Sequence, residues 1–381
     1  MLFQEQEIWM LVMNWCMILC TYLLLRPILY VVKETPDDKN IKTYIMAALC
    51  SAMLFCMFSF WGKDWFHYQE FFEEIKITGG SDFFEDFYIY LIEYLCPHYM
   101  FFRLFVWGLA LLLLVFLFRV TKVNLAILLF MFTTVWLPIF SYARASLSMS
   151  ALFLGGALLV YHNDKKRITN ITLGILCLVA SFLFHKSAIY GIVLVLGCLP
   201  FYNKRVGIFL PFIIVPTLFF IIKITLSALD LSGDSGSEGR MELMSSVGNQ
   251  YLNSIDEGGD TTKGWLLAVF LERVSYYLLA LMSFIMLWKQ KLQDNKVVKL
   301  IAYFLLWNVA ISSLFAFDYG VNTSVFYGRF LRFSIIPSTI VIAYMYDKEI
   351  FPRAVRYIYM TAFVGTLYMI GYILISLITH R

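Results

Sequence analysis

Runs of apolar residues long enough to cross a bilayer recur along most of the chain. A transmembrane helix needs about 20 mainly apolar residues. Runs near this length fall at about 8–31, 43–61, 100–118, 123–140, 145–161, 170–184, 187–202, 206–226, 264–288, 298–317, 330–346 and 356–378. The pattern predicts an all-α, polytopic integral membrane protein with about twelve transmembrane helices, forming a single transmembrane domain over residues 1–381.

Two long connections interrupt these runs, at about 62–98 and 227–263. The first alternates aromatic and acidic residues (WFHYQEFFEEI, DFFEDFYIYLIEYL), which predicts amphipathic helices at the membrane surface. If the spans alternate, the short Lys-rich connections, such as KQKLQDNKVVK at 289–299, lie on the opposite side. Because cytoplasmic connections carry an excess of Lys and Arg, both long connections and both termini are expected to be extracytoplasmic.

Composition supports the membrane assignment and narrows the chemistry. Hydrophobic residues make up 61% of the chain and charged residues only 15%, against about a quarter in soluble domains. The seven cysteines form no CxxC pair, and GxxxxGK[ST], HExxH and GxSxG motifs are absent. Nucleotide hydrolysis and zinc or serine hydrolase chemistry therefore have no motif. We expect no cofactor, no metal site and no nucleic-acid partner.

Several cations stand at the extracytoplasmic ends of spans, where the positive-inside rule does not explain them. Arg144 opens the small-residue segment ARASLSMSALFLGGA, Arg329 and Arg332 lie in FYGRFLRFS, and Lys186 and Arg273 occupy similar outer positions. An ionisable group at such depth needs a partner or hydration. The Arg144 and Arg329 guanidinium groups suit bidentate phosphate binding. For Arg273, pairing with a neighbouring glutamate is the simpler interpretation.

Two residues on the same side are candidates for proton transfer. His185 sits between two apolar runs in SFLFHKSAIYG, and imidazole titrates near neutral pH. Asp64, in WGKDWFHY, is the carboxylate alternative, and Tyr68 follows about one helical turn later. The structural alternatives are a histidine hydrogen-bonded at a helix end and an aspartate that caps a helix. Sequence alone does not choose between His185 and Asp64 as the base.

Several segments occur in a fixed order along the chain: Asp64 and Tyr68, EDFYIYLIEYL at 85–95, ARASLSMSALFLGGALLVY at 143–161, SFLFHKSAI at 181–189 and FYGRFLRFS at 326–334. In this ordered set the chain resembles the EpsG family, which is grouped with the Wzy-like polysaccharide polymerases of bacterial envelopes. The chain departs from the pattern at Arg144-Ala145, where many relatives have Arg-Gln, and at Glu85-Asp86-Phe87, where relatives often have an acidic-Pro-Gly turn.

The resemblance implies a GT-C-like glycosyltransferase with extracytoplasmic loops, held in the bacterial inner (cytoplasmic) membrane with its active site facing outside. Its substrates would be donor and acceptor oligosaccharides on undecaprenyl diphosphate, joined into exopolysaccharide, capsule or O-antigen. Flippase and chain-length regulator proteins would be its partners, and the lipid bilayer its surroundings. In that interpretation His185 or Asp64 activates the acceptor hydroxyl, while Arg144 and Arg329, helped by Lys186 or Arg332, hold the diphosphate. Tyr68 and Arg273 are further candidates for substrate binding.

Three other functions fit parts of the same pattern. A lipid-linked oligosaccharide flippase or transporter would also need cations, although such a protein predicts charges on both sides of the membrane midplane. A membrane glycan acyltransferase would also use a histidine base, but its acyl donor would come from the cytoplasm, whereas His185 is expected on the opposite side. A ligase that attaches finished glycan would share the donor site. Clustering of the unexplained charges on one side favours chemistry at that face.

Overall fold

The chain is helical throughout the part that can be described. The computed structural model describes residues 16, 38–58, 64–80, 84–137, 143–161, 166–214, 217, 262–314 and 330–379, and no strand occurs among them. The predicted all-α class is therefore confirmed for these residues. Apart from residue 16, the predicted first span at 8–31 lies outside them, and so do residues 227–261 of the predicted connection at 227–263.

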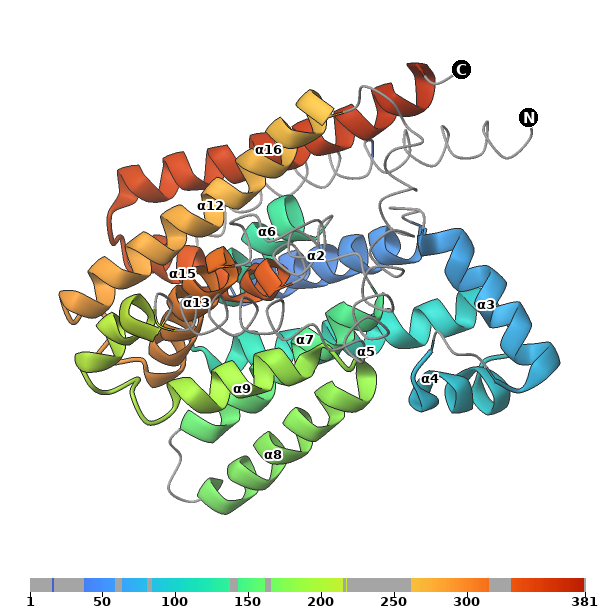
Figure 1. Ribbon diagram of the computed structural model, residues 1–381, viewed down its shortest axis with the longest axis horizontal. Coiled ribbons are helices and arrows are strands. Elements are labelled where there is room, and N and C mark those ends of the chain that lie inside the picture. The colour runs from blue at the N-terminus through green and yellow to red at the C-terminus, as the bar shows by residue number, and fades with distance from the viewer. Residues whose placement is uncertain are drawn as a thin grey trace, which may run out of the picture.

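The helices follow the apolar runs of the sequence closely (Figure 1). In chain order they are α2 (Asp38–Phe58), α3 (Asp64–Thr78), α4 (Asp86–Tyr90), η1 (Leu91–Leu95), α5 (Tyr99–Val120), α6 (Leu125–Met131), η2 (Phe132–Trp136), α7 (Ala143–Val160), α8 (Arg167–Phe184), α9 (Ala188–Cys198), α12 (Thr262–Trp288), α13 (Lys296–Leu314), η4 (Arg332–Ser334), α15 (Ile335–Asp347) and α16 (Pro352–Thr379).

Local signals explain where individual helices begin and end. The Asn124 side chain caps α6 by accepting hydrogen bonds from the Ala126 and Ile127 amides at 2.9 and 3.4 Å, which satisfies amides that the first turn leaves unpaired. The C-terminal end of α12 is capped by a Schellman motif: the Lys291 amide donates to the Met286 carbonyl at 2.9 Å, and Gln290 has a φ of 56°.

α7 is the central element of the bundle, and it packs against α5, α8, α9 and α13. Small residues allow α8 to approach it closely. A Cβ added to Gly155 of α7 would lie 2.8 Å from the carbonyl oxygen of Gly174 in α8, so the two backbones are almost in contact there. Ser148 of α7 also donates to the Ser181 carbonyl of α8 at 2.8 Å. The small residues of α7 therefore hold α8 in place.

Three helices are both long and apolar enough to cross a membrane when only the described residues are searched: α5, α8 and Lys296–Ser313 of α13. α8 buries little of its length and exposes Leu173, Ile175 and Leu176 among others, as expected for a helix with a lipid-facing side. The shorter apolar helices include Leu125–Trp136, Arg144–Val160, Ala188–Cys198 and Arg273–Trp288. The total of about twelve crossings and the GT-C-like arrangement stay predictions.

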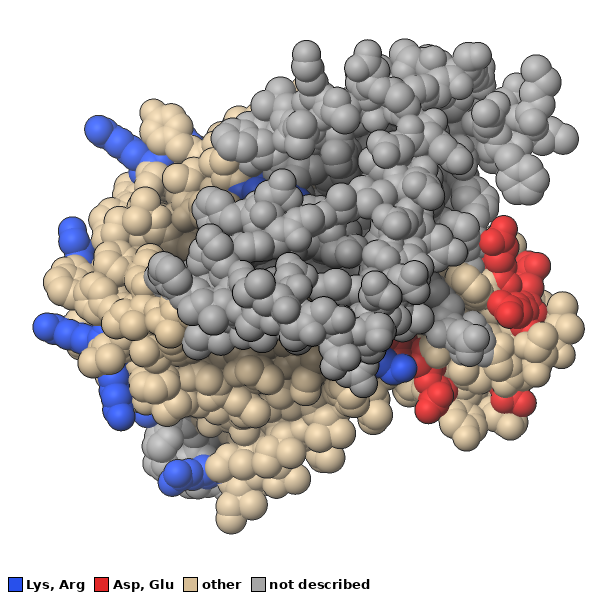
Figure 2. All heavy atoms as spheres, in the orientation of Figure 1, with Lys and Arg blue, Asp and Glu red and all other residues tan. Residues whose placement is uncertain are grey.

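Charge is segregated between the two ends of the bundle. Figure 2 shows the acidic side chains on the visible face gathered at the end where α3 and α4 lie, and most of the basic side chains toward the opposite end. The exposed acidic residues of this region include Glu70, Glu73, Glu74, Asp86 and Glu93. Connection 62–98 forms the helices α3, α4 and η1 within its described part, as predicted. It places a polar, acidic surface at one end of an apolar bundle.

Candidate active site

His185 lies at the break between α8 and α9, at the acidic end of the bundle. Its backbone is extended, with φ −163° and ψ 122°, so α8 ends at Phe184. The His185 amide still donates to the Ser181 carbonyl at 3.1 Å, and the His185 carbonyl accepts from the Ala188 amide at 2.9 Å. The imidazole is part-buried, with 29% of the side chain exposed. The His185 backbone is therefore fixed to two helix ends, and its ring is reachable from outside.

Arg144 is the second residue of α7 and is almost fully buried, with 8% of the residue exposed. Its Nη1 donates to Oε2 of Glu85 at 3.0 Å, and its Nε donates to the Tyr68 hydroxyl at 3.0 Å. The guanidinium carbon lies 5.3 Å from the centre of the Tyr68 ring and 5.0 Å from that of Phe84, within the range of cation–π attraction. Arg144 is thus enclosed by residues of the connection between α2 and α5.

Glu85 joins Arg144 to His185. Its second oxygen, Oε1, lies 2.8 Å from Nδ1 of His185. Glu85 occupies the N-cap position of α4 but makes no side-chain hydrogen bond to that helix, so its carboxylate reaches across to the bundle. One carboxylate therefore holds an arginine from α7 and a histidine from the α8–α9 break, three segments far apart in the sequence.

Aromatic packing fixes the segment that carries Glu85. The Phe84 ring meets that of Phe102 edge-on, with centroids 5.9 Å apart, and lies 5.8 Å from that of Tyr88. On the other side, Phe87 packs edge-on against Phe184 at 4.8 Å. Phe184 directly precedes His185, so this contact holds Glu85 and His185 in register. Such ring pairs contribute about 0.5–1.5 kcal/mol each beyond their buried area.

The electrostatics of the cluster favour an ionised carboxylate. Burial raises the pKa of Glu85, but the hydrogen bond from His185 and the charge of Arg144 together outweigh it, so the pKa lies below its ordinary value of 4.5. An ionised carboxylate can only accept hydrogen bonds. Nδ1 of His185 must therefore carry the proton that faces Glu85, and in the neutral ring Nε2 is left as the proton acceptor. The arrangement is that of a general base oriented by a carboxylate.

The comparisons with known proteins place the chain in a family. The family model described as EpsG family matches residues 41–380, nearly the whole chain. The chain belongs to the EpsG family. No curated protein and no solved structure matches it. The matched range includes every residue of the cluster around Glu85, so the family relationship covers the site as well as the helices.

Of the residues singled out from the sequence, the structure brings three together in this EpsG-family chain: Tyr68, Arg144 and His185. Lys186 follows His185 and is exposed. Asp64 is the first residue of α3, but its side chain lies outside the described part of the structure. All of Arg329 lies outside it too. The choice between His185 and Asp64 as base therefore stays a prediction.

Arg332 begins η4, which packs beside the first turn of α9. The rings of Tyr190 and Phe330 stack with centroids 4.0 Å apart, and a Cβ added to Gly191 would lie 3.0 Å from the Phe333 ring. Asn308 of α13 supports this contact, because its amide donates to the Phe330 carbonyl at 3.1 Å and accepts from the Tyr190 hydroxyl at 2.9 Å. Residues 330–334 thus lie close to the segment that follows His185.

Arg273 is a different case among the predicted cations. It is half-buried within α12, a helix that packs mainly against α13 and α16. Arg144, His185 and Glu85 lie on other elements: in α7, at the α8–α9 break and directly before α4. Its predicted role in substrate binding stays a prediction that the geometry does not strengthen.

Glu85 is the residue of the EpsG-family site that the sequence did not single out. It was visible only as one acid among many in DFFEDFYIYLIEYL and as the start of a departure from the family's usual turn. The available signal was its place directly after an aromatic pair and directly before a short helix. That signal does not distinguish Glu85 from Asp86, which is exposed.

Proposed function

We propose that the chain is a glycosyltransferase that polymerises oligosaccharide repeat units carried on undecaprenyl diphosphate. EpsG-family membership supports the polymerase role, and the apolar helices support an enzyme that works on membrane-held lipid substrates. The basic end of the bundle would lie in the cytoplasm by the positive-inside rule. The cluster of Glu85, Arg144 and His185, at the acidic end, would then face outside, where a flippase delivers the repeat units and a chain-length regulator limits the product.

The observation that carries the proposal is the 2.8 Å hydrogen bond between Glu85 and His185. In the proposed step, Nε2 of His185 removes the proton from the acceptor hydroxyl. The freed oxygen attacks the anomeric carbon of the donor, and the bond between that carbon and the diphosphate oxygen breaks. Undecaprenyl diphosphate leaves with the bonding electrons. Glu85 stabilises the imidazolium that forms, because an adjacent carboxylate favours the charged ring.

The leaving diphosphate needs positive charge to stabilise it as the bond breaks. Arg144 shares its charge with Glu85 and its Nε with Tyr68, which supports a positioning role for it in this arrangement. Lys186 is exposed directly after His185, and Arg332 belongs to the segment packed beside α9. We assign the diphosphate to Lys186, Arg332 and Arg329, with Arg144 at the border of that site.

A complementation experiment in the native host tests the proposal. The gene is deleted and replaced by wild type, His185→Ala or His98→Ala, and both surface polymer and lipid-linked glycans are analysed. His98 is an exposed histidine at the same end, at the N-cap of α5, with no side-chain capping bond. Loss of polymer with accumulation of single lipid-linked repeat units outside, seen in the deletion and with His185→Ala but not with His98→Ala, is the expected result.

The other outcomes reassign the protein. Repeat units trapped on the cytoplasmic leaflet would make it a flippase. Polymer of normal length that lacks an acyl group would make it a modifying enzyme, and finished polymer left on its lipid would make it a ligase. Full activity with His185→Ala would remove this histidine from the mechanism and leave Asp64 as the base to test.

A further inference from the structure

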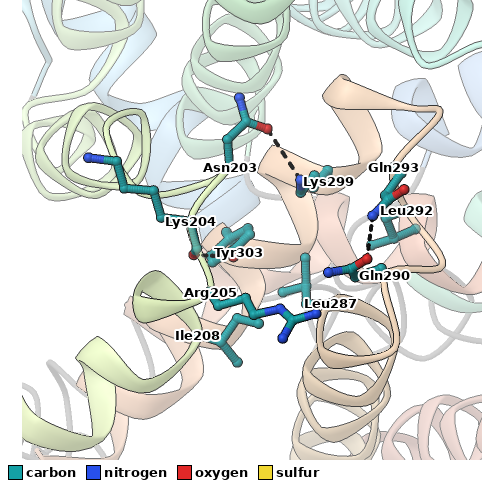
Figure 3. Close-up of a pocket in the computed structure, with 10 residues that line it drawn as sticks. All are labelled: Asn203, Lys204, Arg205, Ile208, Leu287, Gln290, Leu292, Gln293, Lys299 and Tyr303. Carbon is teal, nitrogen blue, oxygen red and sulfur yellow. Dashed lines mark hydrogen bonds between the residues drawn. The ribbon is translucent and has the colours of Figure 1, made fainter.

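A small polar cavity lies at the basic end of the bundle, opposite the candidate active site. It has a volume of about 90 Å³ and forms where the connection after α9 meets the connection after α12 over the first turns of α13 (Figure 3). The polar residues that line it include Asn203, Arg205, Gln290, Gln293, Lys299 and Tyr303. A buried water needs about 10–15 Å³ on this measure, so the cavity has room for a small polyatomic anion.

Two cations with fixed neighbours face this cavity. Lys299 of α13 is half-buried, and its Nζ donates to Oδ1 of Asn203 at 3.2 Å. Gln290 lies beside Arg205, and with its amide oxygen turned toward the guanidinium it accepts from Nε at 3.2 Å and from Nη2 at 2.7 Å. Figure 3 shows the Lys204 side chain directed away from the other residues. The positive charge of the cavity therefore comes from Arg205 and Lys299.

The rest of the lining leaves these charges without an anion. Among the described residues no carboxylate lines the cavity: Asp294 belongs to the same connection as Gln290 but is not part of the wall. Ile208, Leu287 and Leu292 form apolar parts of the wall, which lowers the local dielectric and strengthens attraction for an anion. A guanidinium, an ammonium and amide groups together make a donor set suited to phosphate oxygens.

The position of the cavity points to the headgroup layer of the membrane. Trp288 ends α12 next to Leu287, which lines the cavity, and half of its surface is exposed. Its ring meets that of Phe209, which is 39% exposed, edge-on at 5.5 Å. Exposed tryptophan is typical of the boundary between hydrocarbon and headgroups. Basic pockets between helices on the cytoplasmic side are a known form of phospholipid site.

We propose that this cavity binds a phosphate group between Arg205 and Lys299. The source is either an anionic phospholipid headgroup or free phosphate from solution, because both present the same tetrahedral oxygens. The proposal is independent of the glycosyltransferase assignment, since it concerns the opposite end of the molecule.

Thermal unfolding of the purified full chain tests the site. The protein is held in alkyl maltoside micelles, which contain no phosphate, and then phosphatidylglycerol, inorganic phosphate or potassium chloride of matched ionic strength is added. The variants are Arg205→Gln and Lys299→Gln, and Lys299→Arg retains the charge. Arg353→Gln and Lys296→Gln are controls that remove one exposed charge near the same end without touching the cavity.

The expected result is a rise in the unfolding midpoint of wild type with phosphatidylglycerol, retained in both controls and in Lys299→Arg. Arg205→Gln and Lys299→Gln should each weaken the apparent affinity about tenfold or more, since each removes a charge-assisted hydrogen bond. The same pattern with inorganic phosphate alone would identify free phosphate as the ligand. The proposal is overturned if neither ligand raises the midpoint above chloride, or if controls and cavity variants lose the rise equally.

Discussion

Replacing Glu85 by glutamine removes one negative charge from the centre of the candidate active site while keeping the shape of the side chain. The Glu85 side chain is 11% exposed and that of Arg144 10%, with 3.0 Å between their charged atoms. Breaking a buried ion pair by removing one partner typically costs about 3–5 kcal/mol. The amide oxygen can still accept one hydrogen bond, so the loss in unfolding free energy should fall toward the lower part of that range.

The effect on catalysis should exceed the effect on stability. The glutamine amide no longer stabilises a His185 imidazolium, so a general base worth about 10²–10⁴ in rate loses most of its effect. We expect a fall of about a hundredfold or more in the rate at which membranes from the variant strain extend lipid-linked repeat units. Asp86→Asn is the matched control, because it removes the adjacent carboxylate, which is exposed.

A double variant tests whether Glu85 orients His185 or has only a structural role. If Glu85 acts through His185, combining Glu85→Gln with His185→Ala should lower the rate no further than His185→Ala alone, because residues that act as a unit are not additive. Rates are compared at equal amounts of folded protein, judged by thermal unfolding. Independent, multiplicative losses would refute the reasoning, as would a Glu85→Gln enzyme as active as Asp86→Asn.

Three further predictions follow from described contacts. Below about pH 4.5, acidification should lower the unfolding midpoint of wild type. The pKa of Glu85 is lower in the folded chain than its ordinary value, so the ionised carboxylate adds stability above that value, and this stability is lost as Glu85 becomes protonated. Glu85→Gln should lack this part of the pH dependence, and parallel pH curves for the two proteins would contradict the prediction. Asn308→Ala should lower the free energy of unfolding by about 1–3 kcal/mol in a denaturant titration, because it leaves the partly buried Tyr190 hydroxyl poorly satisfied; an unchanged midpoint would count against it. Gly155→Ala should cost about 1–3 kcal/mol in the same titration by forcing α7 from α8, whereas Gly108→Ala, with its nearest side chain 3.8 Å away, should not.

Much of the helical framework was predictable from sequence because each helix depends on local signals. The apolar runs at 100–118, 145–161 and 170–184 correspond to α5, α7 and α8 within a few residues. The break at His185 was also visible, since it separates two apolar runs. The number of membrane-spanning helices was not predictable in the same way. Helices such as α9 are apolar but short, so hydrophobicity alone does not tell a full span from a buried segment.

The site was only partly predictable because its decisive contact is nonlocal. Arg144 and His185 stood out as charged or titratable groups at the ends of apolar runs. Glu85 did not, because several acids share its neighbourhood and all look alike without knowledge of burial. What distinguishes it is aromatic packing of Phe84 and Phe87 against α5 and α8, which turns one carboxylate inward and leaves Asp86 outside.

The order in which the chain is made has a consequence for when this site can exist. Glu85 precedes Arg144 by 59 residues and His185 by 100, so it leaves the ribosome well before either partner. Until α7 and α8 are inserted, the α3–α4 segment lacks both partners of Glu85, although Phe84 can already pack against Phe102 of α5. A nascent chain that ends before His185 therefore holds the carboxylate without its histidine, and the cluster of Glu85, Arg144 and His185 forms only after the central helices have assembled.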